Sequence, residues 1–152
     1  PRSSKMVITS HTKDGLALAK EYHIPDIIQD FIIQHHGDSL ASYFYNQAVA
    51  QEGAENVKEE QFRYPGPKPN TKETAILMMA DAVEAASRSL TEITEASISA
   101  LVDKIIGYQE SEKFFAESPL SYKEITTIKE VFKKRLMAIY HTRISYPDEK
   151  KK

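Results

Sequence analysis

The chain contains no cysteine and no long apolar run. Without cysteine among its 152 residues it has no disulfides and no thiolate metal site, so any metal must be bound by His and carboxylate side chains. No apolar stretch approaches about 18 residues, so the sequence predicts neither a transmembrane helix nor a signal peptide. The formal net charge is −2, so no basic surplus indicates binding to a DNA or RNA polymer.

Strand-like alternation and internal repeats are also absent, whereas apolar residues recur at helical spacing. A chain of 152 residues is long enough for one domain with a substantial core. We therefore expect an all-α fold, a bundle of about six helices over residues 1–147, followed by a disordered tail over residues 148–152.

Six segments carry the helical pattern. They begin at Ser3 or Ser4, Pro25, Ser39, Asn70, Glu95 and Ser121, and end near Tyr22, His36, Gln51, Leu90, Ile106 and His141. Asn70 with Glu73, and Ser121 with Glu124, are predicted capping boxes. Gly107 is the expected end of the fifth helix.

The apolar spacing also predicts which helix faces are buried. The expected inner positions of the first helix are Val7, Ile8, His11, Leu18 and Ala19; those of the fourth are Ile76, Leu77, Ala80 and Val83; those of the last are Ile125, Ile128, Phe132, Leu136, Ile139 and Tyr140. Gly15 weakens the first helix by about 1 kcal/mol relative to Ala unless another element packs closely against it.

A His-His pair closes the most apolar of these helices. His35 follows Phe31 by four residues and His36 follows Ile32 by four, so both are expected to continue the buried stripe. Neutral imidazoles beside an apolar wall suit a divalent metal. Neighbouring helical positions diverge by about 100°, so both rings serve one metal only at a frayed helix end before Gly37, and otherwise serve two adjacent metals. A helix-end surface pair, or a satisfied pair in the core, is the alternative.

Residues 62–69, the proline-rich loop, contain three prolines and cannot be helical. Arg63 and Lys68 in this loop, with Lys72 just after it, offer cations for phosphate groups. Tyr64 offers an aromatic face on which adenine could stack. A connector without contact to substrate is the alternative.

Asp81 stands among apolar residues of the fourth helix. A carboxylate buried there without a partner would be costly, so a buried Asp81 requires a compensating cation. Pairing with Arg88 or Lys72, or exposure to water, is the alternative. Glu84 and Arg88 are better placed as a surface pair. His11 lies on or beside the buried stripe of the first helix.

Five motifs together resemble a known family. They are Ser-His-Thr-Lys-Asp-Gly, Gln-His-His-Gly, Phe-Arg-Tyr-Pro-Gly-Pro-Lys-Pro, Met-Ala-Asp-Ala-Val-Glu-Ala-Ala-Ser-Arg-Ser-Leu and Ile-Tyr-His-Thr-Arg-Ile-Ser-Tyr-Pro. In this order, and over nearly the whole chain, they resemble the cytoplasmic HD domain of the bacterial seven-transmembrane HD phosphohydrolases. The resemblance implies a phosphodiesterase that cleaves cyclic di-AMP to linear pApA with two divalent metal ions, usually manganese or iron.

The resemblance also implies roles for single residues and a location. His11, His35, His36 and Asp81 match metal ligands of the family. The domain would lie on the cytoplasmic side of the cell membrane, as part of an integral membrane protein, with membrane contact only through segments outside this chain. The oligomeric state is not predicted.

One departure from the family pattern concerns the His-Asp pair that names the fold. The family has an upstream His and an adjacent His-Asp pair, and no His-Asp dipeptide occurs in this sequence. We therefore expect the chain to begin after that pair, as an N-terminally truncated domain that hydrolyses cyclic di-AMP poorly by itself. The main alternative is a catalytically incomplete regulatory or interaction domain, and a structural zinc bundle is a weaker third.

Overall fold

The computed structural model describes the backbone of residues 2–143 and the side chains of residues 8–141. Its elements are α1 (Arg2–Glu21), α2 (Asp26–Gln34), α3 (Ser42–Glu52), the short 3-10 helices η1 (Ala54–Asn56) and η2 (Glu59–Phe62), α4 (Lys72–Ser87), α5 (Glu95–Ser111) and α6 (Tyr122–Arg143). Within the described residues no strand forms beyond an isolated bridge between Leu40 and Arg63. The all-α expectation is confirmed, and the predicted tail at 148–152 lies outside the described residues.

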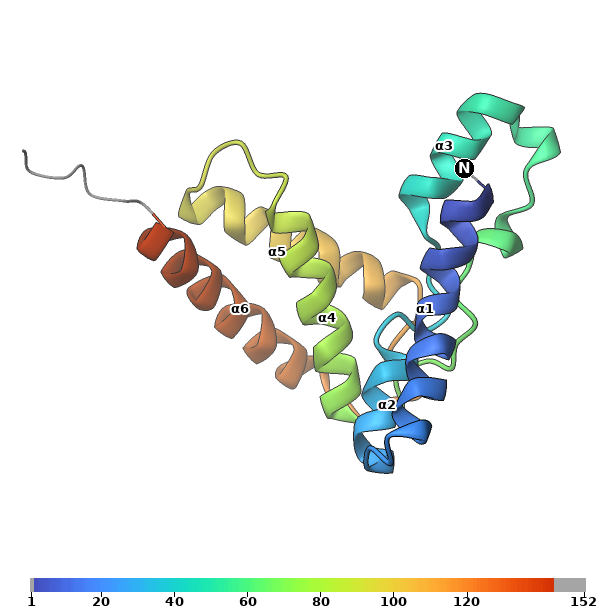
Figure 1. Cartoon of the computed structure of the whole chain (residues 1–152). Coiled ribbons are helices and arrows are strands. Elements are labelled where there is room, and N and C mark those ends of the chain that lie inside the picture. The colour runs from blue at the N-terminus through green and yellow to red at the C-terminus, as the bar shows by residue number, and fades with distance from the viewer. Residues whose placement is uncertain (1, 144–152) are drawn as a thin grey trace, which may run out of the picture.

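Five of the α-helices form two groups, and α3 instead contacts η1 and η2 (Figure 1). In the first, α5 packs against both α4 and α6, and we call these three helices the α4–α6 bundle. In the second, α1 packs along α2, and we call them the α1–α2 pair. Contacts between α2 and α4 join the two groups, so side chains from both can meet where these helices approach each other.

The hydrophobic core lies in the α4–α6 bundle. It comprises Ala75, Met78, Met79, Val83, Ile98, Val102, Ile106, Phe114, Phe115, Ile125 and Leu136. Met79, Val102 and Ile106 have no exposed surface at all. Burying side chains of this size stabilises a fold by about 1.5 to 3 kcal/mol each, so this bundle contains most of the chain's apolar stabilisation.

Three of the predicted inner faces need correction. On α4 the buried side chains include Met78 and Met79, whereas Leu77 is 38% exposed. The helix lies between α5 and α2, so its buried stripe is set by two neighbours and is rotated from the simplest periodic choice. Ile139 on α6 and Leu18 on α1 are exposed as well. Val7 lies outside the residues whose side chains are described.

Two predicted helix ends are also wrong. The capping box of α4 is formed by Thr71 and Thr74, whereas the backbone N–H of Asn70 donates to a side chain of α2. Helix α5 runs through Gly107, which does not adopt positive φ, to Ser111, and the residue with positive φ after it is Lys113, at 58°. The predicted box at the start of α6 is confirmed by reciprocal hydrogen bonds between Ser121 and Glu124.

Gly15 allows close packing within the α1–α2 pair. A Cβ atom at this position would lie 3.0 Å from Cγ2 of Ile32 on α2. Helix α2 therefore packs closely against Gly15, as expected for a glycine in the middle of a helix. It brings α1 near enough to α2 for their side chains to share one site.

Candidate metal centre

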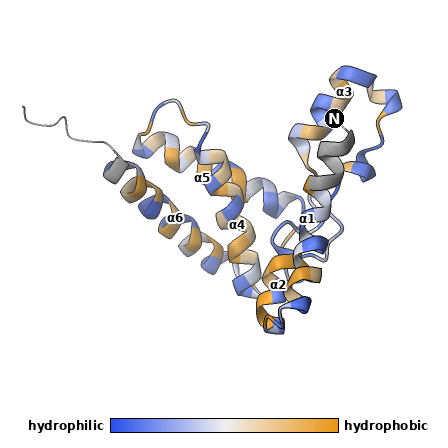
Figure 2. Cartoon of the chain, in the orientation of Figure 1, coloured by the Kyte–Doolittle hydropathy of each residue, from blue (hydrophilic) through white to orange (hydrophobic). Residues whose placement is uncertain are grey.

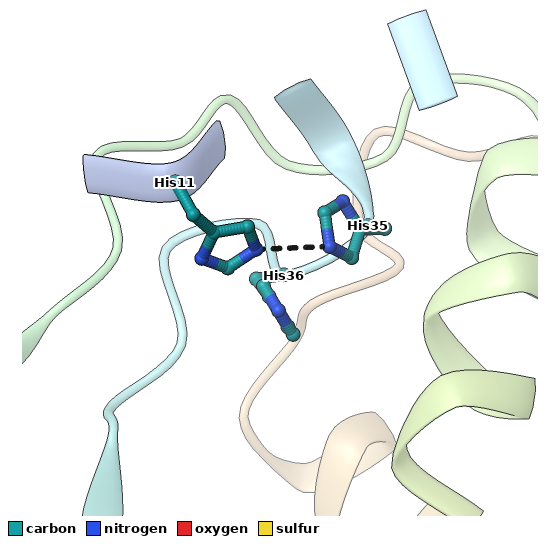
Figure 3. A group of neighbouring side chains, drawn as sticks. All are labelled: His11, His35 and His36. Atoms are coloured by element: carbon teal, nitrogen blue, oxygen red, sulfur yellow. Dashed lines mark hydrogen bonds between the residues drawn. The ribbon is translucent and has the colours of Figure 1, made fainter. Parts of the chain in front are cut away.

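Three histidines, one from α1 and two from the turn after α2, meet at one point (Figure 3). His11 lies on α1, and His35 and His36 follow directly after α2. Each offers one ring nitrogen, and these three nitrogens lie within 4.8 Å of one another. The Nε2 atoms of His11 and His35 are 3.3 Å apart. The structure therefore brings together three of the four side chains expected to bind metal.

Backbone contacts determine the tautomers of two of these rings. Nδ1 of His11 lies 2.5 Å from the carbonyl oxygen of Ile8, and Nδ1 of His35 lies 2.9 Å from that of Ile32. A carbonyl oxygen only accepts hydrogen bonds, so each Nδ1 carries the proton and donates. The Nε2 atoms of both rings therefore point toward the same place, 3.3 Å from each other. This arrangement fits residues that bind a cation, since metal-binding histidines usually donate their other N–H to such a carbonyl.

His36 is neutral for a different reason. Burial, together with the neighbouring His35 and His11, lowers the pKa of His36 to about 3. Its ring is therefore uncharged at neutral pH and has a lone pair available for a metal. Its Nδ1 lies 3.7 Å from Oδ2 of Asp81, which brings the carboxylate of α4 to the edge of the histidine cluster.

Asp81 is not buried, contrary to one expectation from the sequence. Its side chain is 47% exposed, so water solvates the carboxylate and no compensating cation is required for folding. The alternative pairing with Arg88 is not found, because Nη2 of Arg88 lies 2.8 Å from the carboxylate of Glu84. The predicted surface pair of Glu84 and Arg88 is thereby confirmed.

Two residues beside the histidines determine where the rings lie. Gln34 is 2% exposed, and its Oε1 accepts a hydrogen bond of 3.1 Å from the backbone N–H of Asn70, just before α4. Gly37 has a φ of +53°, a conformation that favours glycine, and it lets the chain turn away directly after His36. The sequence marked Gly37 as a turn, but it did not reveal Gln34, because a lone Gln at a helix end carries no specific signal.

The proline-rich loop borders the histidine cluster. The backbone N–H of Tyr64 donates to the carbonyl oxygen of Ser39 at 2.9 Å, and that of Gly66 donates to Gly37 at 3.0 Å. The Tyr64 ring stacks on His36, with centroids 4.2 Å apart and planes inclined by 21°. Burial, with the nearby Asp81, raises the pKa of the Tyr64 hydroxyl. The loop therefore packs directly against one of the candidate ligands.

The three cations predicted to contact substrate have different surroundings. Arg63 forms a 2.6 Å ion pair with Glu59 and donates a 3.1 Å hydrogen bond to the carbonyl oxygen of Asp38. Nζ of Lys68 lies 3.8 Å from the Asp38 carboxylate. Both cations therefore lie next to the turn that follows the histidines. Lys72 instead pairs with Glu124 at the start of α6.

Comparison with known proteins finds similar sequences and structures, although no family model matches the chain. The sequence is 46% identical over 150 residues to the cyclic-di-AMP phosphodiesterase PgpH of Listeria monocytogenes, and 43% identical over 152 residues to that of Bacillus subtilis. The crystal structure of the L. monocytogenes PgpH HD domain matches the fold with a TM-score of 0.84 at 44% identity. Over nearly its whole length, the chain is similar to the HD domain of PgpH. The resemblance seen in the five motifs is confirmed.

The matches cover nearly all of this chain but only part of the PgpH proteins. The match to the L. monocytogenes protein covers 99% of the chain and the match to the B. subtilis protein covers 100%, and each covers 21% of the PgpH sequence. The solved PgpH HD domain is covered to 65%, and the same domain in complex with cyclic-di-AMP is covered to 64%, with a TM-score of 0.86. The chain thus spans about a fifth of the length of these curated relatives. Among the described residues, no helix is both long and apolar enough to cross a membrane.

Proposed function

We propose that this HD domain acts in a metal-dependent phosphodiesterase that hydrolyses cyclic di-AMP to linear pApA. The observation that carries the proposal is the convergence of His11, His35 and His36, whose ring nitrogens lie within 4.8 Å of one another. Three imidazoles so close together have a physical reason to meet if they bind a cation. The PgpH relatives supply the substrate class, because their names state that they are cyclic-di-AMP phosphodiesterases.

In this proposal, His11, His35, His36 and Asp81 hold two divalent ions, manganese or iron by analogy with the family. Bound ions of this kind supply Lewis acidity and lower the pKa of a water molecule that can attack phosphorus. Residues of the chain orient the ligand rings and keep one of them neutral. The carbonyl oxygens of Ile8 and Ile32 orient two rings, and burial keeps His36 neutral.

Contacts to the phosphate groups come from the proline-rich loop. Arg63 and Lys68 lie beside the turn that follows the histidines, so they can neutralise phosphate charge near the cluster. We assign Tyr64 a positioning role, since its ring stacks on His36, and adenine stacking would use its opposite face. Contact between Lys72 and substrate stays a prediction, which requires its ammonium to leave Glu124.

The role of Arg63 can be tested with Arg63→Ala in the intact protein. A cation that contacts phosphate equally in the ground and transition states changes KM more than kcat. We expect a loss in binding on the order of 1 to 3 kcal/mol that decreases at high salt. Arg88→Ala, at an exposed ion pair on α4, is the control and should leave KM unchanged. Unchanged KM and kcat in Arg63→Ala would leave the loop as a connector.

The proposed function as a whole is tested by metal analysis together with activity. The intact protein is purified, its metal content is measured, and hydrolysis of cyclic di-AMP is followed before and after chelation and after addition of manganese or iron. The proposal expects bound divalent metal and turnover that depends on it. A folded protein without metal and without turnover would support the regulatory or interaction domain instead, and tightly bound zinc without turnover would support the structural zinc bundle.

The location is a separate part of the proposal. By analogy with the family, we place this domain on the cytoplasmic side of the cell membrane, within an integral membrane protein. Protease added to intact spheroplasts should leave the domain undigested, and protease added after lysis should cleave it. Digestion in intact spheroplasts would contradict this location.

A further inference from the structure

The connection between α5 and α6, residues 112–121, contacts the segment that leads into α4. Within this connection, Oγ of Ser118 donates a hydrogen bond of 2.7 Å to the carbonyl oxygen of Pro69, 49 positions earlier in the sequence. An ion pair between Lys72 and Glu124 joins the starts of α4 and α6 nearby, but its side chains are 44% and 40% exposed, so water weakens it. Ser118 therefore provides the more specific contact between these two parts of the chain.

Ser118 is itself held by the α4–α6 bundle. Its backbone N–H donates to the carbonyl oxygen of Phe115 at 3.0 Å, and its own carbonyl oxygen accepts from the N–H of Leu120 at 2.8 Å. Phe115 belongs to the hydrophobic core, and only 8% of its surface is exposed. The hydrogen bond from Ser118 therefore holds Pro69 in place relative to the core.

The peptide group between Pro69 and Asn70 has a hydrogen-bond partner on each side. Its carbonyl oxygen accepts from Ser118, and its N–H, which belongs to Asn70, donates to Oε1 of Gln34 at 3.1 Å. Because a peptide group is planar, a rotation that changes the direction of the carbonyl also changes the direction of the N–H. The two hydrogen bonds therefore support each other, and Ser118 can act on Gln34 through one rigid group.

Gln34 connects this peptide group to the histidines. Its side chain is 2% exposed, and its carbonyl oxygen accepts from the N–H of Gly37 at 2.9 Å, which closes the turn around His35 and His36. A Cβ atom on Gly37 would lie 3.5 Å from Cδ of Pro69, whose ring is fully buried. Pro69 therefore lies next to the turn that carries two of the candidate metal ligands.

We propose that Ser118 is a positioning residue for the metal centre, which it reaches through the peptide group after Pro69 and the side chain of Gln34. The inference rests on the proposed function, because the position of the histidine turn matters for hydrolysis only if its rings bind metal. Indirect partners of metal ligands contribute about 10-fold to 100-fold to metal affinity or activity. Ser118 acts through two intervening groups, so we expect a contribution of about 10-fold.

The affinity of the intact protein for manganese, measured by competition with a chelator, tests this role. Ser118→Ala removes the hydroxyl group and should lower the affinity about 10-fold. Ser118→Thr keeps a hydroxyl group and should retain the affinity, and equal losses in the two variants would contradict the inference. Ser89→Ala is the matched control, because Oγ of Ser89 also donates to a carbonyl oxygen at 2.7 Å, just after α4, and its loss should leave the affinity unchanged.

A double-mutant cycle tests the route from Ser118 to the histidines. Gln34→Met removes the acceptor of the Asn70 N–H, keeps a side chain of similar size, and should also lower the affinity for manganese. If both residues act through one peptide group, Ser118→Ala should cause little further loss in the Gln34→Met protein. Losses that simply add would mean that Ser118 acts by another route, and the inference would be overturned.

Hydrogen exchange in the metal-free intact protein gives a measurement that does not depend on activity. The backbone amides of Gly37 and Asn70 both donate to Gln34, so peptides that contain them should exchange about 5-fold faster or more in Ser118→Ala, as for the loss of one hydrogen bond. Peptides from the last turns of α6 should exchange at their usual rate, as should all three groups of peptides in Ser89→Ala.

The outcomes separate this inference from the proposed function. If the unmodified protein binds no divalent metal, the proposed function fails, whereas hydrogen exchange still decides whether Ser118 holds the histidine turn. If metal binds, and Ser118→Ala keeps both its affinity and its exchange rates, the proposed function stands and the role of Ser118 is overturned. A Ser118→Ala protein that does not fold would also overturn it, because the hydrogen bond would then serve the fold as a whole. Should Gln34→Met fail to fold, the two Ser118 variants decide the outcome.

Discussion

The α4–α6 bundle and the α1–α2 pair bury their apolar residues very differently. In the bundle, Val102 and Ile106 have no exposed surface. In the pair, Leu18 is 55% and Ile27 is 69% exposed, although α2 is among the most hydrophobic helices of the chain (Figure 2). Apolar content alone therefore does not indicate which helices form the core. The bundle is stabilised by burial, whereas the pair depends on a few specific contacts.

The candidate metal centre includes residues from both groups. His11, His35 and His36 belong to the α1–α2 pair or the turn after it, and Asp81 belongs to α4 of the bundle. The hydrogen bond from the Asn70 N–H to Gln34 is one of the contacts that hold the two groups together near the site. Substitutions in the core of the α4–α6 bundle should therefore lower stability. Substitutions where the two groups meet should instead alter metal binding.

The largest expected effect comes from the core of the bundle. Ile106→Ala removes a side chain with no exposed surface and should lower the free energy of unfolding by about 2 to 5 kcal/mol. The same substitution at the exposed Ile27 of α2 should change it by about 0.5 kcal/mol or less. Urea denaturation of both variants measures the difference. Similar losses at the two positions would show that the two groups do not differ as described.

The next effect separates activity from folding. Because Asp81 is 47% exposed, Asp81→Ala should leave the melting temperature nearly unchanged. It should nevertheless reduce metal-dependent hydrolysis of cyclic di-AMP by about 100-fold or more in the intact protein, since even indirect partners of metal ligands contribute about 10-fold to 100-fold. Glu84→Ala, on the same helix, is the control and should retain turnover. A variant of Asp81 with normal metal content and near-normal turnover would exclude Asp81 as a ligand.

A smaller effect is expected at the contact between α1 and α2. Gly15→Ala places a Cβ atom 3.0 Å from Cγ2 of Ile32, so α1 must shift unless Ile32 moves. We expect a net loss of about 1 kcal/mol in stability, because the strain of overpacking exceeds the gain in helix propensity. Metal affinity should fall as well, because His11 moves with α1.

The double variant Gly15→Ala/Ile32→Leu is the matched control for this contact. Leu has no branch at Cβ and therefore removes the Cγ2 methyl group that the new Cβ atom on α1 would meet. Stability and metal affinity should both recover toward the values of the unmodified protein. If Gly15→Ala alone is neutral or stabilising, the close packing of α1 on α2 does not determine the site.

The smallest effect concerns the ion pair at the start of α6. Hydrogen bonds from Lys72 and then from Ser121 lower the pKa of Glu124 from 4.5 to about 2. A carboxyl group whose pKa is lowered on folding stabilises the fold above its unfolded pKa, and this contribution is lost as the pH falls through the folded pKa. The contribution of Glu124 is thus present above pH 4.5 and is lost between pH 4.5 and about 2.

Denaturation of Glu124→Gln across this pH range measures that contribution. The variant should differ from the unmodified protein above pH 4.5, and the difference should shrink steadily toward pH 2. The effect is small because the pair is exposed to solvent. Glu117→Gln, at another exposed position before α6, serves as the comparison. A difference independent of pH would mean that the ion pair does not account for the effect.

Local patterns in the sequence were sufficient for much of this protein. Helical spacing of apolar residues predicted an all-α fold, and the Ser121–Glu124 box and the turn at Gly37 followed from the chemistry of single residues. These features depend on contacts between residues close in the chain, so a short window of sequence contains them. The five motifs pointed to the HD family because they occur in its order.

Tertiary structure alone decided how the helices present their side chains. It placed Nε2 of His11 3.3 Å from that of His35, left Asp81 exposed, and paired Lys72 with Glu124. It also brought Ser118 within hydrogen-bonding distance of Pro69. These outcomes depend on distances and rotations between helices that are far apart in sequence. Packing against several neighbours sets those distances, and helical periodicity specifies only which residues share a face.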